Sequence, residues 1–200
     1  MQNITTIVDK AYEIGMMQIR EEIMMAAHHV FALRPRHLLE IGTAGGGTFY
    51  VWCACAAPGG IRISLDLPGG PYGGREYADS FKLSDRNKVI RSWAPDAILL
   101  PLNSHTRAAV KAVEDSLRGE ELDLLIIDGD HSYNGVTKDF TLYSPFMRQG
   151  GCILFHDIND TLYHRSRGVR VGQLWCELRG NKSEFNAHLK WGGWGVLLMD

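Results

Sequence analysis

The stretch that decides the fold is His37-Leu38-Leu39-Glu40-Ile41-Gly42-Thr43-Ala44-Gly45-Gly46-Gly47-Thr48-Phe49-Tyr50. A short apolar run ends at an acid, passes into a glycine-rich turn and continues in a helical pattern, which predicts a strand, a tight loop and a helix. Glycine allows positive φ and lets a ligand approach the main chain closely. The free N–H groups and the positive dipole end of the helix would point at whatever occupies the loop. The turn is therefore predicted to hold a cofactor.

The glycine spacing argues against a dinucleotide as that cofactor. A dinucleotide-binding fold requires G-x-G-x-x-G directly after its strand. Here three consecutive glycines begin at Gly45, three residues after Gly42, and Tyr50 stands where the last glycine of the motif would fall. The alternative to a cofactor turn is a structural strand-to-helix turn in another kind of α/β protein.

The composition is that of an ordinary globular chain. The 200 residues are 45% hydrophobic and 22% charged, with a formal net charge of −2. We therefore expect one domain, 1–200, without a broad electrostatic attraction for nucleic acid or an anionic membrane. No apolar run approaches the roughly 18 residues of a membrane span, and the first ten residues lack a signal-peptide pattern. The four cysteines form no C-x-x-C pair, which favours free thiols and a cytoplasmic location.

Residues 1–34 are predicted to form a helical cap on a core of residues 35–200. Apolar side chains recur at helical spacing from Thr5 to Leu33, and Gly15 would divide this helix in two.

Strand and helix patterns alternate along the core. After the opening strand, turn and helix (Gly46–Ala57), we expect the strands Ile61–Asp66, Ala97–Leu102, Leu122–Ile127 and Cys152–Phe155, the helices Arg75–Trp93, Thr106–Leu117, Val136–Met147 and Val169–Leu178, and a closing antiparallel pair, Phe185–Leu189 with Trp194–Met199. The alternation predicts an α/β fold with a doubly wound, mostly parallel sheet.

Polar side chains collect where these strands end, at Glu40, Asp66, Asn103, Asp128, His131, His156 and Asp157. Open α/β sheets bind ligands at the carboxyl ends of their strands. In a nucleoside-binding fold, an acid at the position of Asp66 can accept hydrogen bonds from both ribose hydroxyls, and its alternative role is to cap a loop. The segment Leu67–Gly74, rich in glycine and proline, is interpreted as a lid or substrate loop, with a plain linker as the alternative.

A second block makes a family resemblance specific. It comprises Ile126-Ile127-Asp128-Gly129-Asp130-His131-Ser132-Tyr133-Asn134-Gly135-Val136, then Asp139-Phe140, Gly150-Gly151 and Phe155-His156-Asp157. Together with the glycine turn, it makes residues 37–180 resemble class I S-adenosylmethionine-dependent methyltransferases. The resembling branch includes macrocin-type sugar O-methyltransferases and cephalosporin-hydroxylase-related proteins. The resemblance implies a Rossmann-like, seven-stranded sheet with a C-terminal antiparallel strand pair and N-terminal helices, and S-adenosylmethionine as cofactor.

The resemblance also implies which residues contact the cofactor. The glycine turn would line the methionine moiety, Glu40 would reach its amino group, and Asp66 would hold the ribose. Asn103 and Ser104 stand where relatives contact the adenine end, with a weaker match. The full implied set is Glu40, Gly42, Thr43, Ala44, Gly45, Asp66, Leu67, Asn103, Ser104 and Asp128.

A metal and a general base are implied at the fourth and fifth strand tips. In metal-dependent relatives an Asp after the fourth strand binds a divalent ion with acids after the fifth, and these positions are Asp128 and the pair His156-Asp157. His156 departs from the acidic pattern, and Mg²⁺ prefers oxygen ligands, so both a Mg²⁺-assisted and a metal-free site stay open. His131 stands where the sugar methyltransferases place a general base.

The chemistry fits these residue types independently. Methyl transfer to a hydroxyl is an in-line displacement in which the alcohol must lose its proton to a histidine or be acidified by a cation. We therefore predict an O-methyltransferase acting on a small hydroxylated acceptor, a sugar or a natural product, with His131 as base. The alternatives are an oxidoreductase of the hydroxylase-related or NAD kind, or a non-catalytic cofactor-binding protein on the same fold. A homo-oligomer is compatible with the sequence.

Overall fold

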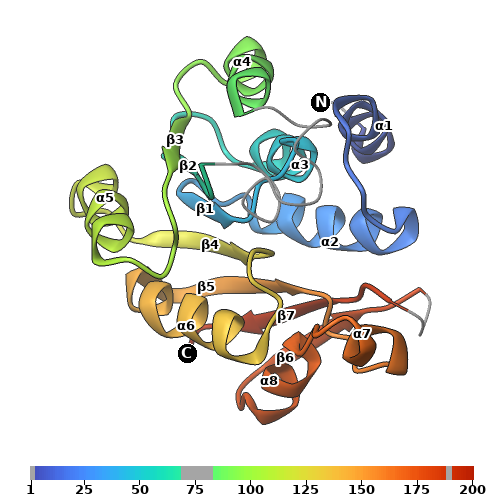
Figure 1. Ribbon diagram of the computed structural model, residues 1–200. Helices are drawn as coiled ribbons and strands as arrows, with labels where there is room; N and C mark the ends of the chain where they lie inside the picture. The colour runs from blue at the N-terminus through green and yellow to red at the C-terminus, as the bar shows by residue number, and fades with distance from the viewer. Residues whose placement is uncertain (1–2, 69–82, 188–190) are drawn as a thin grey trace.

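A seven-stranded sheet runs through the middle of the molecule in the order β3-β2-β1-β4-β5-β7-β6 (Figure 1). The computed structural model describes residues 3–68, 83–187 and 191–200. The strands are β1 (Leu38–Ile41), β2 (Arg62–Asp66), β3 (Ile98–Pro101), β4 (Leu122–Ile127), β5 (Met147–His156), β6 (Lys182–Phe185) and β7 (Trp194–Leu198). β7 runs antiparallel to both of its neighbours, and the other pairs are parallel. This confirms the predicted doubly wound sheet with an antiparallel C-terminal pair.

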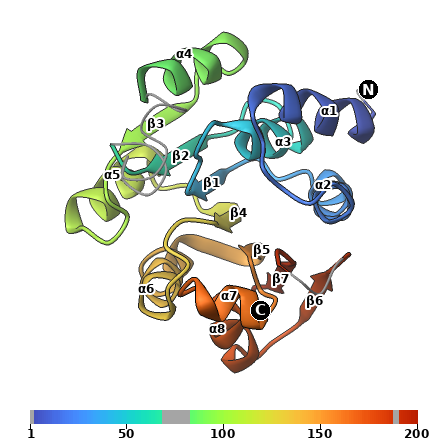
Figure 2. The same cartoon turned by 45° about the vertical axis from the view of Figure 1, so that its right-hand side comes forward.

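Helices cover both faces of the sheet (Figure 2). They are α1 (Ile4–Ile14), α2 (Arg20–Leu33), α3 (Gly47–Cys55), α4 (Leu83–Trp93), α5 (Arg107–Leu117), α6 (Tyr133–Tyr143), the 3-10 helix η2 (Ser144–Phe146), α7 (Leu162–Ser166) and α8 (Val171–Glu177). Buried side chains of α1 to α4 pack on one face, and those of α5, α6 and α8 pack on the other. No helix in the described ranges has the length and hydropathy that a membrane crossing requires.

The central strand β4 explains why both faces need a helical layer. Successive side chains of a strand point to opposite faces, so Leu124 and Ile126 join the α1–α4 layer while Leu125 and Ile127 join the other. All four side chains are fully or almost fully buried. A parallel strand buried on both sides therefore reads as a continuous apolar run.

The register brings the predicted site residues to one edge of the sheet. Ile41, the last residue of β1, pairs with Leu65 on one side and Ile127 on the other, and Ile127 pairs with Phe155. The residues that follow these four therefore emerge together. Because β1 lies between β2 and β4, this edge includes the point where the strand order reverses, where open α/β sheets bind ligands.

The first half of the chain follows the prediction closely. Gly15 ends α1 with a left-handed φ of 107° and its N–H bonds back to the helix, so the predicted division of the N-terminal helix is confirmed. Of the lid predicted at Leu67–Gly74, residues 69–74 lie outside the described residues, as do residues 75–82 of the helix predicted from Arg75.

The helix predicted at Val136–Met147 lies earlier, from Tyr133 to Tyr143. It begins there because the Ser132 side chain accepts a hydrogen bond from the N–H of Gly135 at 3.0 Å, an N-cap contact. It ends there because a proline follows at 145, and the residue before proline is disfavoured in a helix.

Strand β5 begins at Met147, not at the predicted Cys152, and the glycine pair before Cys152 lies inside it. The pairing of β4 with β5 shifts register at this point. A Cβ atom at Gly151 would lie 3.1 Å from the carbonyl oxygen of Asp123. The irregular pairing of the two strands therefore favours glycine at this position.

The C-terminal elements needed the largest correction. The predicted helix Val169–Leu178 is confirmed as α8, but the short helix α7 before it was not predicted. The first strand of the closing pair is Lys182–Phe185, not Phe185–Leu189. Residues 186 and 187 are not strand, and residues 188 and 189 lie outside the described residues.

Candidate active site

The glycine turn after β1 packs directly on the end of β4. Gly42 has a φ of +91°, and a Cβ atom there would lie 2.1 Å from the carbonyl oxygen of Asp128. Its N–H donates to the carbonyl of Leu65 at 3.0 Å. The absence of a side chain at Gly42 therefore lets the main chain of Asp128 approach closely, and this contact places the turn beside Asp128.

Asp66 ties the turn to the end of β2. Its Oδ2 accepts the N–H of Ala44 at 2.9 Å, and its Oδ1 accepts the N–H of Leu67 at 2.7 Å. Arg86 of α4 also donates to Oδ2, at 2.6 Å. Burial raises the pKa of Asp66, and the Arg86 guanidinium opposes that rise. Arg86 was not singled out from the sequence, because its place in a mixed polar helix gives no sign of this partner.

The turn residues Thr43, Gly45 and Gly46 are buried. The hydroxyls of Thr43 and Ser64 lie 2.7 Å apart in the interior. Gly45 is buried, and Gly46 precedes α3 with a φ of 95°. The turn is therefore held from below by β2 and continues into α3, as predicted.

Glu40 lies completely buried under the turn. Its Oε1 accepts a hydrogen bond from Nε1 of Trp52 at 2.9 Å. Its Oε2 has no partner with good hydrogen-bond geometry among the described residues, although the hydroxyls of Thr48 and Thr43 lie near enough to act on its charge. Burial raises the pKa of Glu40 to about 8, and these three neighbours pull it down again in part.

Two histidines converge on Asp128. Its Oδ1 lies 3.1 Å from Nε2 of His131 and 2.9 Å from Nδ1 of His156. The three side chains come from the ends of β4 and β5 and from the loop before α6. His156 is also packed against Trp194, with ring centroids 4.7 Å apart. The structure therefore brings together three residues that the sequence placed at two different strand tips.

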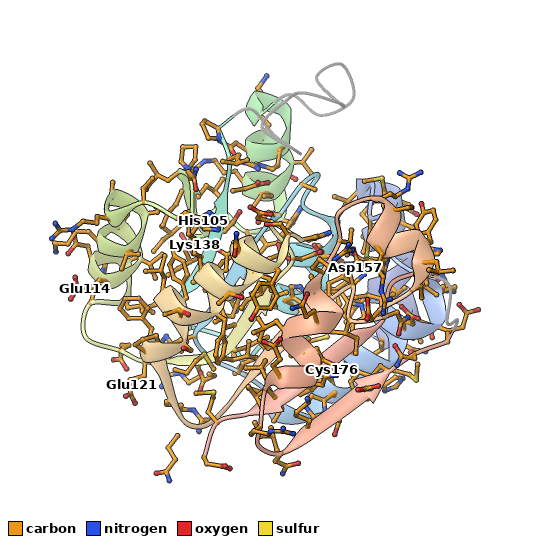
Figure 3. All side chains as sticks on the ribbon, turned by 60° about the horizontal axis from the view of Figure 1, so that its bottom comes forward. His105, Glu114, Glu121, Lys138, Asp157 and Cys176 are labelled. Atoms are coloured by element: carbon orange, nitrogen blue, oxygen red, sulfur yellow. The ribbon has the colours of Figure 1, made fainter. Side chains whose placement is uncertain are left out.

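Asp157 completes this cluster from the other side. Its Oδ2 lies 3.0 Å from Nδ1 of His131, so the imidazole stands between two carboxylates. Asp157 adopts a φ of 61°, a strained conformation for a residue with a side chain, and such strain concentrates at functional sites. In Figure 3 Asp157 lies where the C-terminal segments face the N-terminal helices.

His164 of α7 lies beside Asp157 in the interior. Its Nε2 accepts the N–H of Gly192 at 3.3 Å, and its Nδ1 faces the carbonyl of Asn159. Its Nε2 also lies 3.5 Å from Oδ1 of Asp157. Although two arginines follow it in the next three positions of the chain, His164 is only 3% exposed.

The family model of the methyltransferase domain matches residues 39–158. This interval is more than half of the chain, and it contains the glycine turn, Asp66, Asp128, His131 and the pair His156-Asp157 at the end of β5. The chain belongs to the methyltransferase domain family.

Several known proteins are similar to this methyltransferase domain. The uncharacterized protein y4gI of Sinorhizobium fredii is 28% identical over 160 residues, 78% of this chain, and the chain spans only 16% of that relative. An O-methyltransferase from Bacillus cereus, solved in complex with SAH, superposes with a TM-score of 0.64 at 15% identity, covering 96% of this chain and 90% of that one. A putative caffeoyl-CoA O-methyltransferase from Staphylococcus aureus gives 0.66 at 13% identity, covering 99% and 93%. At such identities the structures show a shared fold.

The charges of the cluster are coupled through its hydrogen bonds. Burial alone would lower the pKa of His131, but its bonds to Asp128 and Asp157 raise it well above the ordinary value. The pKa of His156 is likewise raised against the effect of burial. Burial opposes the ionisation of both aspartates, yet the neighbouring histidines hold their pKa values below the usual range. The cluster is therefore two carboxylates facing imidazoles that bind protons tightly.

The donor atoms of this methyltransferase domain also allow a divalent cation. Among the described residues, Asp128, His131 and His156 each offer one ligand atom, and these atoms lie within 4.8 Å of one another. One carboxylate oxygen with imidazole nitrogens suits Mn²⁺, Fe²⁺ or Zn²⁺ better than Mg²⁺, which prefers oxygen ligands alone. Asp157, expected from the sequence as a ligand, instead faces His131.

Two predicted residues lie further along the same edge, after β3. Asn103 uses its Oδ1 to accept the N–H of His105 at 2.9 Å, and the carbonyl of Ser104 accepts the hydroxyl of Tyr143 at 2.7 Å. His105 in turn lies 3.2 Å from the buried Asp139. These contacts anchor the loop to α6.

A separate hollow lies away from these residues. It measures about 440 Å³ and is lined by Tyr50, Cys53, Ala54, Arg62 and residues 93–97. Arg62 begins β2 and residue 97 precedes β3, so the hollow opens near the amino ends of the strands. The predicted site residues do not line it.

Proposed function

We propose that this domain transfers a methyl group from S-adenosylmethionine to a hydroxyl of a small acceptor. The observation that carries the proposal is the contact of Gly42 with the main chain of Asp128. Through it, the turn predicted to hold the sulfonium cofactor adjoins the carboxylate that orients His131. Positioning of the two reactants supplies most of the rate in such a displacement.

The cofactor would lie over the glycine turn. Gly42 to Gly45 would line its methionine part, with Glu40 beneath, and Asp66 and Leu67 would adjoin the ribose. Asn103, Ser104 and Asp128 would border the remainder. The complex of the Bacillus cereus O-methyltransferase with SAH supports this cofactor, since that protein has the same fold.

His131 would act as the general base. A bond forms between the acceptor oxygen and the methyl carbon, the bond from that carbon to sulfur breaks, and the hydroxyl proton moves to the neutral imidazole. Asp128 and Asp157 orient the ring and stabilise the imidazolium that results. The same carboxylates make His131 a stronger base while reducing its neutral fraction at pH 7.

A divalent cation is the second means of activating the hydroxyl. Asp128 and His156 would hold it, and Oδ1 of Asp157 lies 3.6 Å from Nδ1 of His156. A bound cation lowers the pKa of a hydroxyl that it touches. The mixed oxygen and nitrogen donors lead us to expect Mn²⁺ to bind more tightly than Mg²⁺.

The acceptor we propose first is a sugar hydroxyl. The support is the block Ile126–Val136, which resembles the macrocin-type sugar O-methyltransferases, together with the base position that this block implies. Hydroxylated natural products form the second class to test.

The decisive experiment is calorimetry with S-adenosylhomocysteine and with NAD⁺, each in EDTA, in Mg²⁺ and in Mn²⁺. We expect S-adenosylhomocysteine to bind and NAD⁺ not to bind. Transfer of a labelled methyl group to a panel of sugars and phenols then identifies the acceptor class. Binding of NAD⁺ alone would support the oxidoreductase alternative instead, and cofactor binding without transfer to any acceptor would support a binding protein.

A further inference from the structure

The turn between α1 and α2 reaches the candidate active site from outside the matched interval 39–158. Gly15 ends α1, and the hydroxyl of Tyr12 donates to the carbonyl of Gln18 at 2.6 Å. The main chain around Gln18 is therefore fixed by the helix before it.

The same turn rests on the first residue of α3. A Cβ atom at Gly47 would lie 2.6 Å from Cβ of Met16 and 2.8 Å from the carbonyl oxygen of Ala11. Gly47 immediately follows the glycine turn that we assign to the cofactor. The N-terminal helices therefore pack against the cofactor turn without an intervening layer.

Gln18 extends from this turn to Asp128. Its Nε2 donates to Oδ2 of Asp128 at 3.2 Å, the oxygen that His131 and His156 leave free. An ionised carboxylate only accepts hydrogen bonds, so the amide nitrogen must face Asp128 and Oε1 must face away. Oε1 is buried and has no hydrogen-bond partner among the described residues. The orientation that directs the amide nitrogen at Asp128 therefore leaves the side-chain carbonyl of Gln18 without a hydrogen bond among the described residues.

We propose that Gln18 is a positioning residue for methyl transfer, one that fixes the rotation of the Asp128 carboxylate so that Oδ1 stays directed at His131. This role rests on the proposed function. A carboxylate held at one oxygen only can turn about its Cβ–Cγ bond, and the imidazole would then lose its fixed orientation. A displacement of about 1 Å in such a group can reduce a rate about a hundredfold.

Two substitutions separate this role from packing. Gln18→Met keeps the length and volume of the side chain and removes the donor. Gln18→Glu keeps the shape and brings a second carboxylate against Asp128. Gln173→Met makes the same change on the exposed face of α8, where the Gln173 amide donates to Glu177 at 3.4 Å, and serves as the control.

The first measurement follows the ring signals of His131 and His156 by nuclear magnetic resonance. We expect them to shift or broaden in both Gln18 variants and to stay unchanged in Gln173→Met. This readout needs no acceptor, so it remains decisive if the proposed activity fails. Unmoved His131 signals in Gln18→Met would overturn the proposal whatever the protein's activity.

The second measurement uses the acceptor found in the panel. We expect kcat to fall about tenfold or more in Gln18→Met and further in Gln18→Glu, with S-adenosylhomocysteine affinity and Tm close to those of Gln173→Met. Equal losses of kcat, cofactor affinity and Tm would show a purely structural role and refute the proposal. Wild-type protein that binds no S-adenosylhomocysteine would refute the proposed function, which is a different outcome.

Discussion

Nη1 of Arg86 lies 2.6 Å from Oδ2 of Asp66, and both side chains are almost completely buried. Removing one partner of a buried ion pair strands the other charge, so we expect Arg86→Leu to destabilise the protein by about 3 kcal/mol in urea unfolding. Adding Asp66→Asn to that variant removes the stranded charge, and the double variant should regain part of the loss.

The exposed pair of Arg20 with Asp9 provides the comparison for this experiment. Arg20→Leu should change the free energy of unfolding little, because solvent screens an exposed pair. Equal effects of the two arginine substitutions would contradict the assignment of a buried pair at Asp66.

Gly42 should not tolerate a methyl group. Gly42→Ala would place Cβ 2.1 Å from the carbonyl of Asp128 at a left-handed φ, and we expect a loss of about 3 kcal/mol or more. Gly59 has a similar φ of +75° but open space around it, so Gly59→Ala should cost only about 1 kcal/mol. Thermal melts of the two variants test the difference, and similar melting temperatures would show that the turn does not rest on β4.

His131→Ala should remove the base without disturbing the cofactor turn. We expect kcat to fall about 10²- to 10⁴-fold, while calorimetry shows S-adenosylhomocysteine affinity close to that of wild type. His28→Ala on the exposed face of α2 is the matched control. Unchanged turnover in His131→Ala would exclude His131 as the base and would favour activation by a cation at Asp128 and His156.

Glu40 should make stability depend on pH. Its pKa is about 8 in the folded protein and 4.5 in an ordinary setting. As the pH rises, Glu40 loses its proton in the unfolded chain before it does so in the folded protein. The contribution of protonated Glu40 to the free energy of unfolding is therefore complete below about pH 4.5 and is lost as the pH rises towards 8. Glu40→Gln has no proton to release. Its free energy of unfolding should vary less over this window and exceed that of wild type above pH 8 by up to about 5 kcal/mol.

Urea unfolding at several pH values, without cofactor, measures this effect. Glu13→Gln changes an exposed glutamate and should reproduce the wild-type curve. Parallel curves for Glu40→Gln and wild type would mean that Glu40 ionises normally in the folded protein.

The fold was largely predictable because its signals are local. The apolar run of β4, the glycine turn and the polar residues at the strand tips all lie within short segments whose periodicity can be read directly. A parallel sheet then places these tips at one edge, so the position of Asp66, Asp128 and His131 at that edge could be predicted without coordinates. The short helix α7 and the displaced β6 carry weak periodic patterns, and they were missed for that reason.

The contacts that complete the site could not be predicted in the same way. Gln18 lies 110 positions from Asp128 in the chain, and Arg86 is an ordinary residue of a polar helix. His164 is followed by Arg165 and Arg167, which suggest solvent, yet its ring is buried. Each of these contacts depends on how separate segments pack against one another. The spacing of residues within one segment carries no information about that packing.

The hydrogen bond from the Trp52 indole to Glu40 gives the protein an intrinsic optical probe. Trp52 also packs edge-on against Trp194, with ring centroids 5.4 Å apart. Ionisation of Glu40 would place a full negative charge at the pyrrole edge of an indole that water does not reach. The emission of Trp52, isolated by difference from a Trp52→Phe variant, can therefore follow events beneath the turn without any attached dye.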